Sequence, residues 1–202
     1  MHVMVDIETL GNDLRTGPII AIGAVPFTMA QPLTRRPTLA DRQFAMWEQA
    51  FYVPIRLKEQ LELGMRIEHE TLQWWLQTDA KLLYEFMTSQ RAESLTAVFG
   101  KFKQWLDELC PEINDRWLWS HGVTYDCQHL AEKWPIVMGE SFNRVCPFRQ
   151  MRDTRTLFHL YEALTGIQPL TLIEREQRHH PLEDAWVQAC AVQIAWKGLI
   201  NG

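Results

Sequence analysis

Two short runs rich in β-branched residues at the start of the chain constrain the fold most. They are HVMVDIE at residues 2–8 and PIIAIGAVPF at residues 18–27, and the GNDLRTG between them carries the Gly, Asn and Asp that turns favour. Two strands separated by such a turn predict a β-hairpin. A third strand is predicted at residues 48–53, after a loop over residues 28–42 that contains two prolines.

From residue 56 onward, apolar residues recur at helical spacing, as in Trp74, Trp75, Leu82, Leu83 and Phe86. An amphipathic helix is predicted at residues 94–109, and a short strand is predicted at 116–120. Further helices are predicted at 127–134, 153–164 and 182–200, the last with a proline at its start. Strands followed by helices, and then strands alternating with helices, predict a mixed α/β sheet with helices packed against it.

The composition is that of one ordinary globular domain. The chain has 202 residues, of which 47% are hydrophobic and 22% charged. Lysine and arginine total 20 against 25 aspartates and glutamates, giving a net charge of −5. This balance excludes a protein that coats nucleic acid by positive charge alone. Any phosphate ligand must therefore be held locally, by a few arginines or by metal ions.

The four cysteines at positions 110, 127, 146 and 190 include no CxxC pair, which disfavours both disulfides and structural zinc. Acidic residues break the apolar run at the N-terminus, so no signal peptide is predicted. Nowhere do 18 apolar residues follow one another, so the sequence predicts no membrane span. We expect a cytoplasmic protein without membrane partners.

Two carboxylates lie at alternate positions of the first predicted strand, in the segment Asp6-Ile7-Glu8. Alternate residues of a strand face the same side, so Asp6 and Glu8 project together while Ile7 faces the opposite side. Paired carboxylates suit Mg²⁺ or Mn²⁺, which favour oxygen ligands. The alternative is a strand end whose acids face solvent.

Two further segments contain candidate functional residues. In HGVTYD (121–126), Asp126 lies where a helix should begin, and it is there either a functional carboxylate or a simple helix cap. In RHHPLEDAW (178–186), His179 and Asp184 are five residues apart around a helix start. Taken alone, they would be a surface histidine and a favourable charge at the positive end of a helix.

In this order, Asp6-x-Glu8, Asp126 and His179-x4-Asp184 resemble the motifs of the DEDD 3′→5′ exonucleases in their histidine-containing branch, DEDDh, the RNase T-like superfamily. TLQWWLQ (71–77) and MRDTRTL (151–157) are similar to segments of the small bacterial and phage RNase T-like exoribonucleases. The resemblance covers nearly the whole chain. It implies an RNase H-like fold, a mixed β-sheet flanked by α-helices, with residues 1–202 as a single RNase T-like exonuclease domain.

The resemblance implies that two divalent cations, Mg²⁺ or Mn²⁺, are held by four carboxylates. It also implies that His179 removes a proton from the attacking water, which suits a side chain that titrates near neutral pH. His180 is the competing base, although the spacing to the last carboxylate favours His179. Two positions depart from the family pattern, with His121 in place of asparagine and Tyr125 in place of phenylalanine. The implied metal ligands are Asp6, Glu8, Asp126 and Asp184.

The predicted substrate contacts are Thr9, Leu10, Tyr125 and Arg178. Thr9 and Leu10 follow the first two ligands, and residues there lie against the terminal nucleotide in this family; ordinary turn structure is the alternative. Trp74 and Trp75 either stack on bases or belong to the core. Further arginines that either bind phosphate or face solvent are at positions 149, 152, 155 and 175.

The expected substrates are 3′ ends of single-stranded or 3′-overhanging RNA or DNA, with nucleoside 5′-monophosphates as products. Family resemblance alone favours RNA, and a 3′→5′ exodeoxyribonuclease of phage or repair type would carry the same motifs. A catalytically silent binding module is disfavoured because all five motif residues are present. A homodimer is a further expectation, because homodimers are frequent among relatives.

Overall fold

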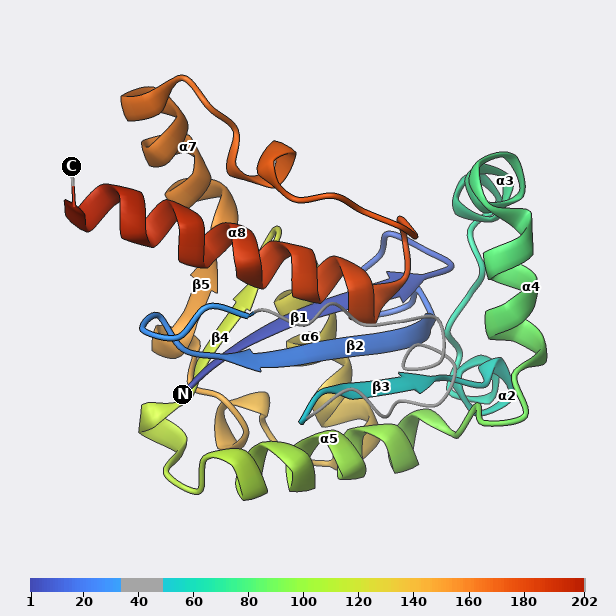
Figure 1. Cartoon of the computed structure of the whole chain (residues 1–202). Coiled ribbons are helices and arrows are strands. Elements are labelled where there is room, and N and C mark those ends of the chain that lie inside the picture. Colours follow the sequence, from blue (N-terminus) through green and yellow to red (C-terminus); the bar gives the residue numbers. More distant parts are fainter. Residues whose placement is uncertain (34–48, 202) are drawn as a thin grey trace.

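The computed structural model of the chain describes residues 1–33 and 49–201. Within these residues lies a five-stranded sheet with the strand order β3-β2-β1-β4-β5 (Figure 1). The first three strands pair in antiparallel fashion, whereas β4 and β5 run parallel to β1. The predicted hairpin and mixed sheet are therefore confirmed. The strands are β1 (His2–Thr9), β2 (Ile19–Phe27), β3 (Phe51–Pro54), β4 (Trp117–Ser120) and β5 (Met151–Asp153).

Side-chain hydrogen bonds hold the turn that joins β1 to β2. The carboxylate of Asp13 accepts from the backbone N–H groups of Arg15 at 3.0 Å and Thr16 at 2.7 Å. The carboxylate of Glu68 accepts from the backbone N–H groups of Asn12 at 2.8 Å and Asp13 at 3.0 Å. Hydrogen bonds within the turn therefore stabilise it, and Glu68 links it to the helical segment that follows β3.

Helices cover both faces of the sheet. In Figure 1, α8 (Pro181–Asn201) lies along one face and α5 (Leu95–Leu109) along the other. α7 (Thr154–Thr165) packs beside α8, and α6 (Asp126–Met138) packs beside α5. The sheet is thus the middle layer of three, as the predicted α/β architecture requires.

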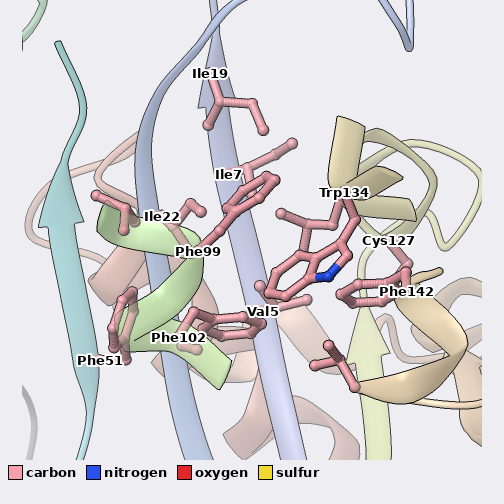
Figure 2. Close-up of a cluster of buried hydrophobic side chains, with 14 of the residues drawn as sticks. Val5, Ile7, Ile19, Ile22, Phe51, Phe99, Phe102, Cys127, Trp134 and Phe142 are labelled. Atoms are coloured by element: carbon pink, nitrogen blue, oxygen red, sulfur yellow. The ribbon is translucent and has the colours of Figure 1, made fainter. Parts of the chain in front are cut away.

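The alternation of β1 decides which side chains meet which helix layer. Val5 and Ile7 enter the cluster with α5 and α6, where the rings of Phe99 and Trp134 stack 4.7 Å apart (Figure 2). Met4 enters the opposite cluster, which α7 and α8 complete. Because Asp6 and Glu8 share the parity of Met4, both carboxylates face the layer that contains α8.

Three shorter helices, α2 (Leu57–Glu62), α3 (His69–Thr78) and α4 (Ala80–Thr88), follow β3. They enclose a third cluster in which Trp75 packs with Leu10 and Phe86. Trp75 is 1% exposed, and its indole N–H donates to the backbone oxygen of Thr9 at 2.9 Å. The core interpretation of Trp75 is confirmed, whereas Trp74 is 42% exposed.

Several predicted boundaries were wrong. The third strand begins at Phe51, because Gln49 and Ala50 make no strand pairing, and it extends through Pro54; residue 48 and most of the predicted loop lie outside the described residues. β5 was not predicted, since it has three residues and pairs with β4 alone. α6 continues past residue 134, with Pro135 inside it, to the left-handed Gly139. Short 3₁₀ turns at 113–115, 142–144, 148–150 and 169–172 complete the described elements. In the described residues, no helix is long and apolar enough to cross a membrane.

Candidate active site

Four carboxylates converge at one edge of the sheet. Asp6 and Glu8 lie on β1, Asp126 is the first residue of α6, and Asp184 lies in the first turn of α8. The C-terminal ends of the parallel strands β1 and β4 share this edge, which is where open α/β sheets place their ligands. The structure therefore brings the four predicted ligands together.

A hydrogen bond connects the Asp126 side chain to β1. Its carboxylate Oδ1 accepts from the backbone N–H of Ile7 at 3.3 Å. The N-cap position of α6 belongs to Tyr125, so the interpretation of Asp126 as a simple cap is wrong. The bond places the Asp126 carboxylate beside the β1 residue that separates the other two acids.

The carboxylates are crowded; Asp126 and Asp184 are buried, and Asp6 and Glu8 are half-buried. Burial, followed by the charges of Asp126 and Asp184, raises the pKa of Asp6 well above its ordinary value. Burial and the Asp6 carboxylate raise the pKa of Glu8 in the same way. Burial raises the pKa of Asp126 to about 7, and burial also raises the pKa of Asp184. Such a group needs protons or cations to offset its charge.

A glycine allows the last carboxylate to reach the first strand. Gly23 of β2 pairs with Asp6 in the ladder. A Cβ atom at Gly23 would lie 2.3 Å from the carbonyl carbon of Pro181 and 2.4 Å from the backbone nitrogen of Leu182. The start of α8 therefore rests directly on the β2 backbone. Gly23 was not predicted as a site residue, although an isolated glycine inside an apolar strand often marks such a close approach.

His179 immediately precedes α8 and faces the carboxylates. Its backbone adopts a left-handed φ of 60°, which is uncommon outside glycine, and its N–H donates to Asp184 Oδ2 at 2.8 Å. One ligand atom each from Glu8, His179 and Asp184 lie within 4.8 Å of one another. The preceding segment is fastened to the same helix, since the backbone N–H of Glu176 donates to Glu183 Oε1 at 2.6 Å.

The adjacent histidine lies elsewhere. His180 is 5% exposed, and its ring lies 4.6 Å from that of Tyr52 and 6.0 Å from that of Phe86. Its backbone oxygen accepts from the N–H of Asp184 at 2.9 Å, which closes the first turn of α8. The geometry thus favours His179 over His180 as the imidazole that serves the carboxylates.

A cleft of about 380 Å³ adjoins Glu8. Tyr125 and Thr9 line it, with their hydroxyl oxygens 2.8 Å apart, and the Tyr125 hydroxyl donates to Asn12 Oδ1 at 3.2 Å. Trp74 lines the same cleft, and its ring meets that of His179 edge to face at 4.9 Å. The cleft therefore joins the carboxylates to an aromatic and hydroxyl-bearing wall.

Two predicted substrate contacts lie outside this wall. Leu10 is 1% exposed and packs in the cluster with Trp75, so its side chain belongs to the core. Arg178 is exposed in the segment before His179, and its backbone oxygen accepts from the Gln177 side chain at 3.2 Å. Neither side chain lines the cleft.

Two contacts to the carboxylates had not been predicted. The guanidinium of Arg175 donates to Asp184 Oδ1 at 3.1 Å, so this arginine is paired with a site carboxylate, and its role toward phosphate stays a prediction. The amide Nε2 of Gln188 donates to Asp6 Oδ1 at 2.8 Å. Gln188 follows Asp184 by four residues, and that helical spacing was the available indication that both face β1.

His121 and the arginines at positions 149, 152 and 155 make contacts near the site but not with the carboxylates. His121 Nδ1 lies 2.7 Å from the hydroxyl of Thr154, which links the end of β4 to α7. Arg155 approaches Gly122 so closely that a Cβ there would lie 3.1 Å from its Nη1. Arg152 stacks on Trp117 at 4.3 Å, and Arg149 lies 5.5 Å from the Phe148 ring centre.

Comparison with protein families agrees with this geometry. Residues 1–196 match the model described as the 3′-5′ exoribonuclease Rv2179c-like domain. The chain belongs to this family. Membership of a 3′-5′ exoribonuclease family confirms the predicted class, that of a hydrolytic 3′→5′ exonuclease domain, and agrees with the predicted DEDD relationship. No curated protein matches the sequence.

Solved structures share the fold of this Rv2179c-like domain. Cell-death related nuclease 4 (CRN-4) superimposes with a TM-score of 0.64 and 14% identity, over 97% of this chain and 63% of that one. The zinc-bound E. coli ExoI–ssDNA complex gives 0.60 and 9% identity, over 97% and 40%. A product-bound exonuclease I gives 0.52 and 11% identity, over 99% and 43%. The predicted RNase H-like fold is confirmed, and the chain spans 40% to 63% of the length of these structures.

Proposed function

We propose that residues 1–202 form one exonuclease domain that removes nucleotides from the 3′ ends of single-stranded RNA with two bound divalent cations. The observation that carries the proposal is the convergence of four crowded carboxylates with the His179 imidazole. The packing of the described helices on one sheet supports a single domain.

We assign cation binding to Asp6, Glu8, Asp126 and Asp184. All four offer carboxylate oxygens, the donors that Mg²⁺ and Mn²⁺ prefer. Their mutual repulsion, expressed in the raised pKa values of Asp6 and Glu8, favours a ligand of opposite charge. When bound, such a cation pair stabilises the attacking and leaving oxygens of an in-line phosphodiester displacement.

We assign proton removal from water to His179. A neutral imidazole nitrogen accepts a proton when it lies within hydrogen-bond reach of the water. The bond from the His179 backbone N–H to Asp184 fixes the residue, and the perpendicular contact with the Trp74 ring supports its side chain beside Glu8. These contacts support a fixed imidazole rather than one that samples solvent.

The cleft beside Glu8 is the proposed pocket for the terminal nucleotide. The hydroxyl groups of Thr9 and Tyr125 are partners for sugar hydroxyls, and burial raises the pKa of Tyr125, so its phenol stays protonated at neutral pH. Proteins distinguish RNA from DNA through the 2′-hydroxyl, and so these groups support RNA as the substrate. Arg178, exposed one residue before His179, is the proposed contact to a strand phosphate.

The proposal is tested with 5′-labelled single- and double-stranded RNA and DNA oligomers in Mg²⁺, Mn²⁺ or EDTA. Single-stranded RNA with a 3′-hydroxyl should give a shrinking ladder, and EDTA should stop the reaction. A 3′-phosphate adds about −1.5 to −2 charge near the carboxylates and should slow cleavage strongly. Equal digestion of circular strands, or activity within about tenfold of wild type in Asp6→Asn, would overturn the mechanism.

The choice of RNA has its own test. Tyr125→Phe removes the phenol hydroxyl and keeps the ring. The ratio of kcat/KM for RNA to that for DNA should fall by about fivefold to tenfold, the scale of one neutral hydrogen bond. An unchanged ratio would remove Tyr125 from sugar recognition, and faster wild-type cleavage of DNA than of RNA would identify an exodeoxyribonuclease.

A further inference from the structure

We infer that Gln188 is a positioning residue that orients the Asp6 carboxylate for cation binding. Its amide Nε2 lies 2.8 Å from Asp6 Oδ1, and the side chain is buried on α8 at 5% exposure. The inference rests on the proposed function, because it assumes that Asp6 is a cation ligand. Gln188 contacts the Asp6 carboxylate, does not line the cleft beside Glu8, and is assigned no contact with substrate.

Asp6 needs such a restraint. The carboxylates of Asp126 and Asp184 repel it, and in residues 1–33 and 49–201 the Asp6 carboxylate receives its hydrogen bond from Gln188 alone. An aspartate held at one oxygen keeps the other oxygen aimed in a defined direction. The same bond favours the charged form of Asp6 and so opposes the effect of burial on its pKa.

The orientation of the Gln188 amide is fixed by Asp6. Its Oε1 is buried, and it has no hydrogen-bond partner among the described residues. Turning the amide over would place Oε1 against the Asp6 carboxylate, where two acceptors repel. A leucine would fill the same space without burying an unpaired carbonyl, whose desolvation is unfavourable. Packing therefore does not explain an amide here, whereas a donor to Asp6 does.

α8 therefore contributes two side chains to the proposed cation site. Asp184 and Gln188 are four residues apart, so they lie on the same face of the helix, and that face rests on the sheet at Gly23 opposite Asp6. One side chain supplies a carboxylate, and the other aims the carboxylate supplied by β1. The two ligands are thus placed relative to each other by one rigid element.

The test measures Mn²⁺ affinity by titration calorimetry without nucleic acid. Gln188→Leu and Gln188→Met remove the donor and keep an apolar side chain of similar size. We expect affinity 10-fold to 100-fold weaker, the usual effect of losing a partner that orients a metal ligand. Thermal melting of both variants checks that they fold, and two different replacements guard against a packing defect in either one.

Gln193→Leu is the matched control. Gln193 lies on the same helix, is 8% exposed, and donates to the backbone oxygens of Thr28 at 2.6 Å and Gln31 at 2.8 Å, away from the carboxylates. It should melt at a lower temperature and bind Mn²⁺ as wild type does. An equal loss of Mn²⁺ affinity in this control would overturn the inference, because it would trace the effect to α8 packing.

A double-mutant cycle shows whether Gln188 acts through Asp6. In an Asp6→Asn background, Gln188→Leu should change Mn²⁺ affinity by less than about threefold. An undiminished effect there, or Gln188→Leu within threefold of wild type, would overturn the inference. Wild-type affinity in Asp6→Asn itself would instead overturn the assignment of Asp6 as a ligand, so the two failures are distinguishable.

Discussion

Gly23 and Asp6 face each other across the β1–β2 ladder, and the backbone of Pro181 fills the space that a side chain at position 23 would need. The first turn of α8, which carries Asp184, is consequently seated on β2 directly beside the strand that carries the first two acids. The spacing of the carboxylates depends on a residue that has no functional group of its own.

Gly23→Ala should therefore impair activity. The added Cβ would lie 2.3 Å from backbone, so the start of α8 must move away from β1, and we expect at least about a tenfold loss of kcat together with a lower melting temperature. Gly100→Ala is the control, because a Cβ there meets nothing within 4 Å and alanine suits a helix. Full activity in Gly23→Ala would contradict this account of how α8 is seated.

The carboxylate cluster should destabilise the cation-free protein as the pH rises. Burial raises the pKa of Asp126 from 3.8 to about 7, and the pKa values of Asp6 and Glu8 are also raised. At these groups the folded state binds more protons than the unfolded state, so their contribution to the free energy of unfolding falls as pH increases from about 4 to 7. His2 and His129, whose pKa values burial lowers to about 4 and about 3, contribute the opposite slope, so the melting profile in EDTA is compared between wild type and Asp6→Asn. Wild type should lose more stability, or gain less, than Asp6→Asn over this range, and identical profiles would contradict the crowding of the carboxylates.

Measurements of kcat and of melting temperature should distinguish the roles of the two adjacent histidines. His179→Ala should lower kcat by at least about a hundredfold, the usual contribution of a general base, with little change in melting temperature. His180→Ala should retain far more activity but unfold earlier, because its ring packs against Tyr52 and Phe86. Mn²⁺ affinity adds a check, since a large loss in His179→Ala would identify a metal ligand rather than a base.

Measurements of stability and of KM should likewise distinguish the two adjacent tryptophans. Trp75→Ala removes a ring that is 1% exposed and should cost about 3–5 kcal/mol of unfolding free energy. Trp74→Ala should leave the melting temperature nearly unchanged and raise KM for single-stranded oligomers, because its ring lines the cleft beside Glu8. An unchanged KM in Trp74→Ala would exclude base stacking at this position.

The sequence predicted those parts of the site that follow from local periodicity. Asp6 and Glu8 share a face because they alternate along β1, and the order of the motifs indicated Asp126, His179 and Asp184. Sequence could not separate Trp74 from Trp75, since adjacent helical residues differ in burial only once the helix has a packing partner. Leu10 shows the same limit, because its burial depends on Trp75 and Phe86, which lie 65 and 76 positions later in the chain.

The unpredicted residues depend on contacts between distant segments. Gln188 and Asp6 are 182 positions apart, and nothing within α8 indicates which strand its amide meets. β5 was missed because three residues form a strand only when β4 offers a free edge. Gly23 was the accessible exception, since a lone glycine in an apolar strand is itself an indication of close approach.

The long separation between Asp6 and Gln188 also has a consequence during synthesis. Chains are synthesised from the N-terminus at about 5–20 residues per second, so about 10 to 40 seconds pass between the appearance of β1 and that of the helix that completes its carboxylate cluster. A nascent chain holding β1 without α8 lacks Asp184, His179 and the donor to Asp6. On a translating ribosome, where single-stranded RNA is always near, the proposed cation site would therefore stay incomplete until α8 has been made.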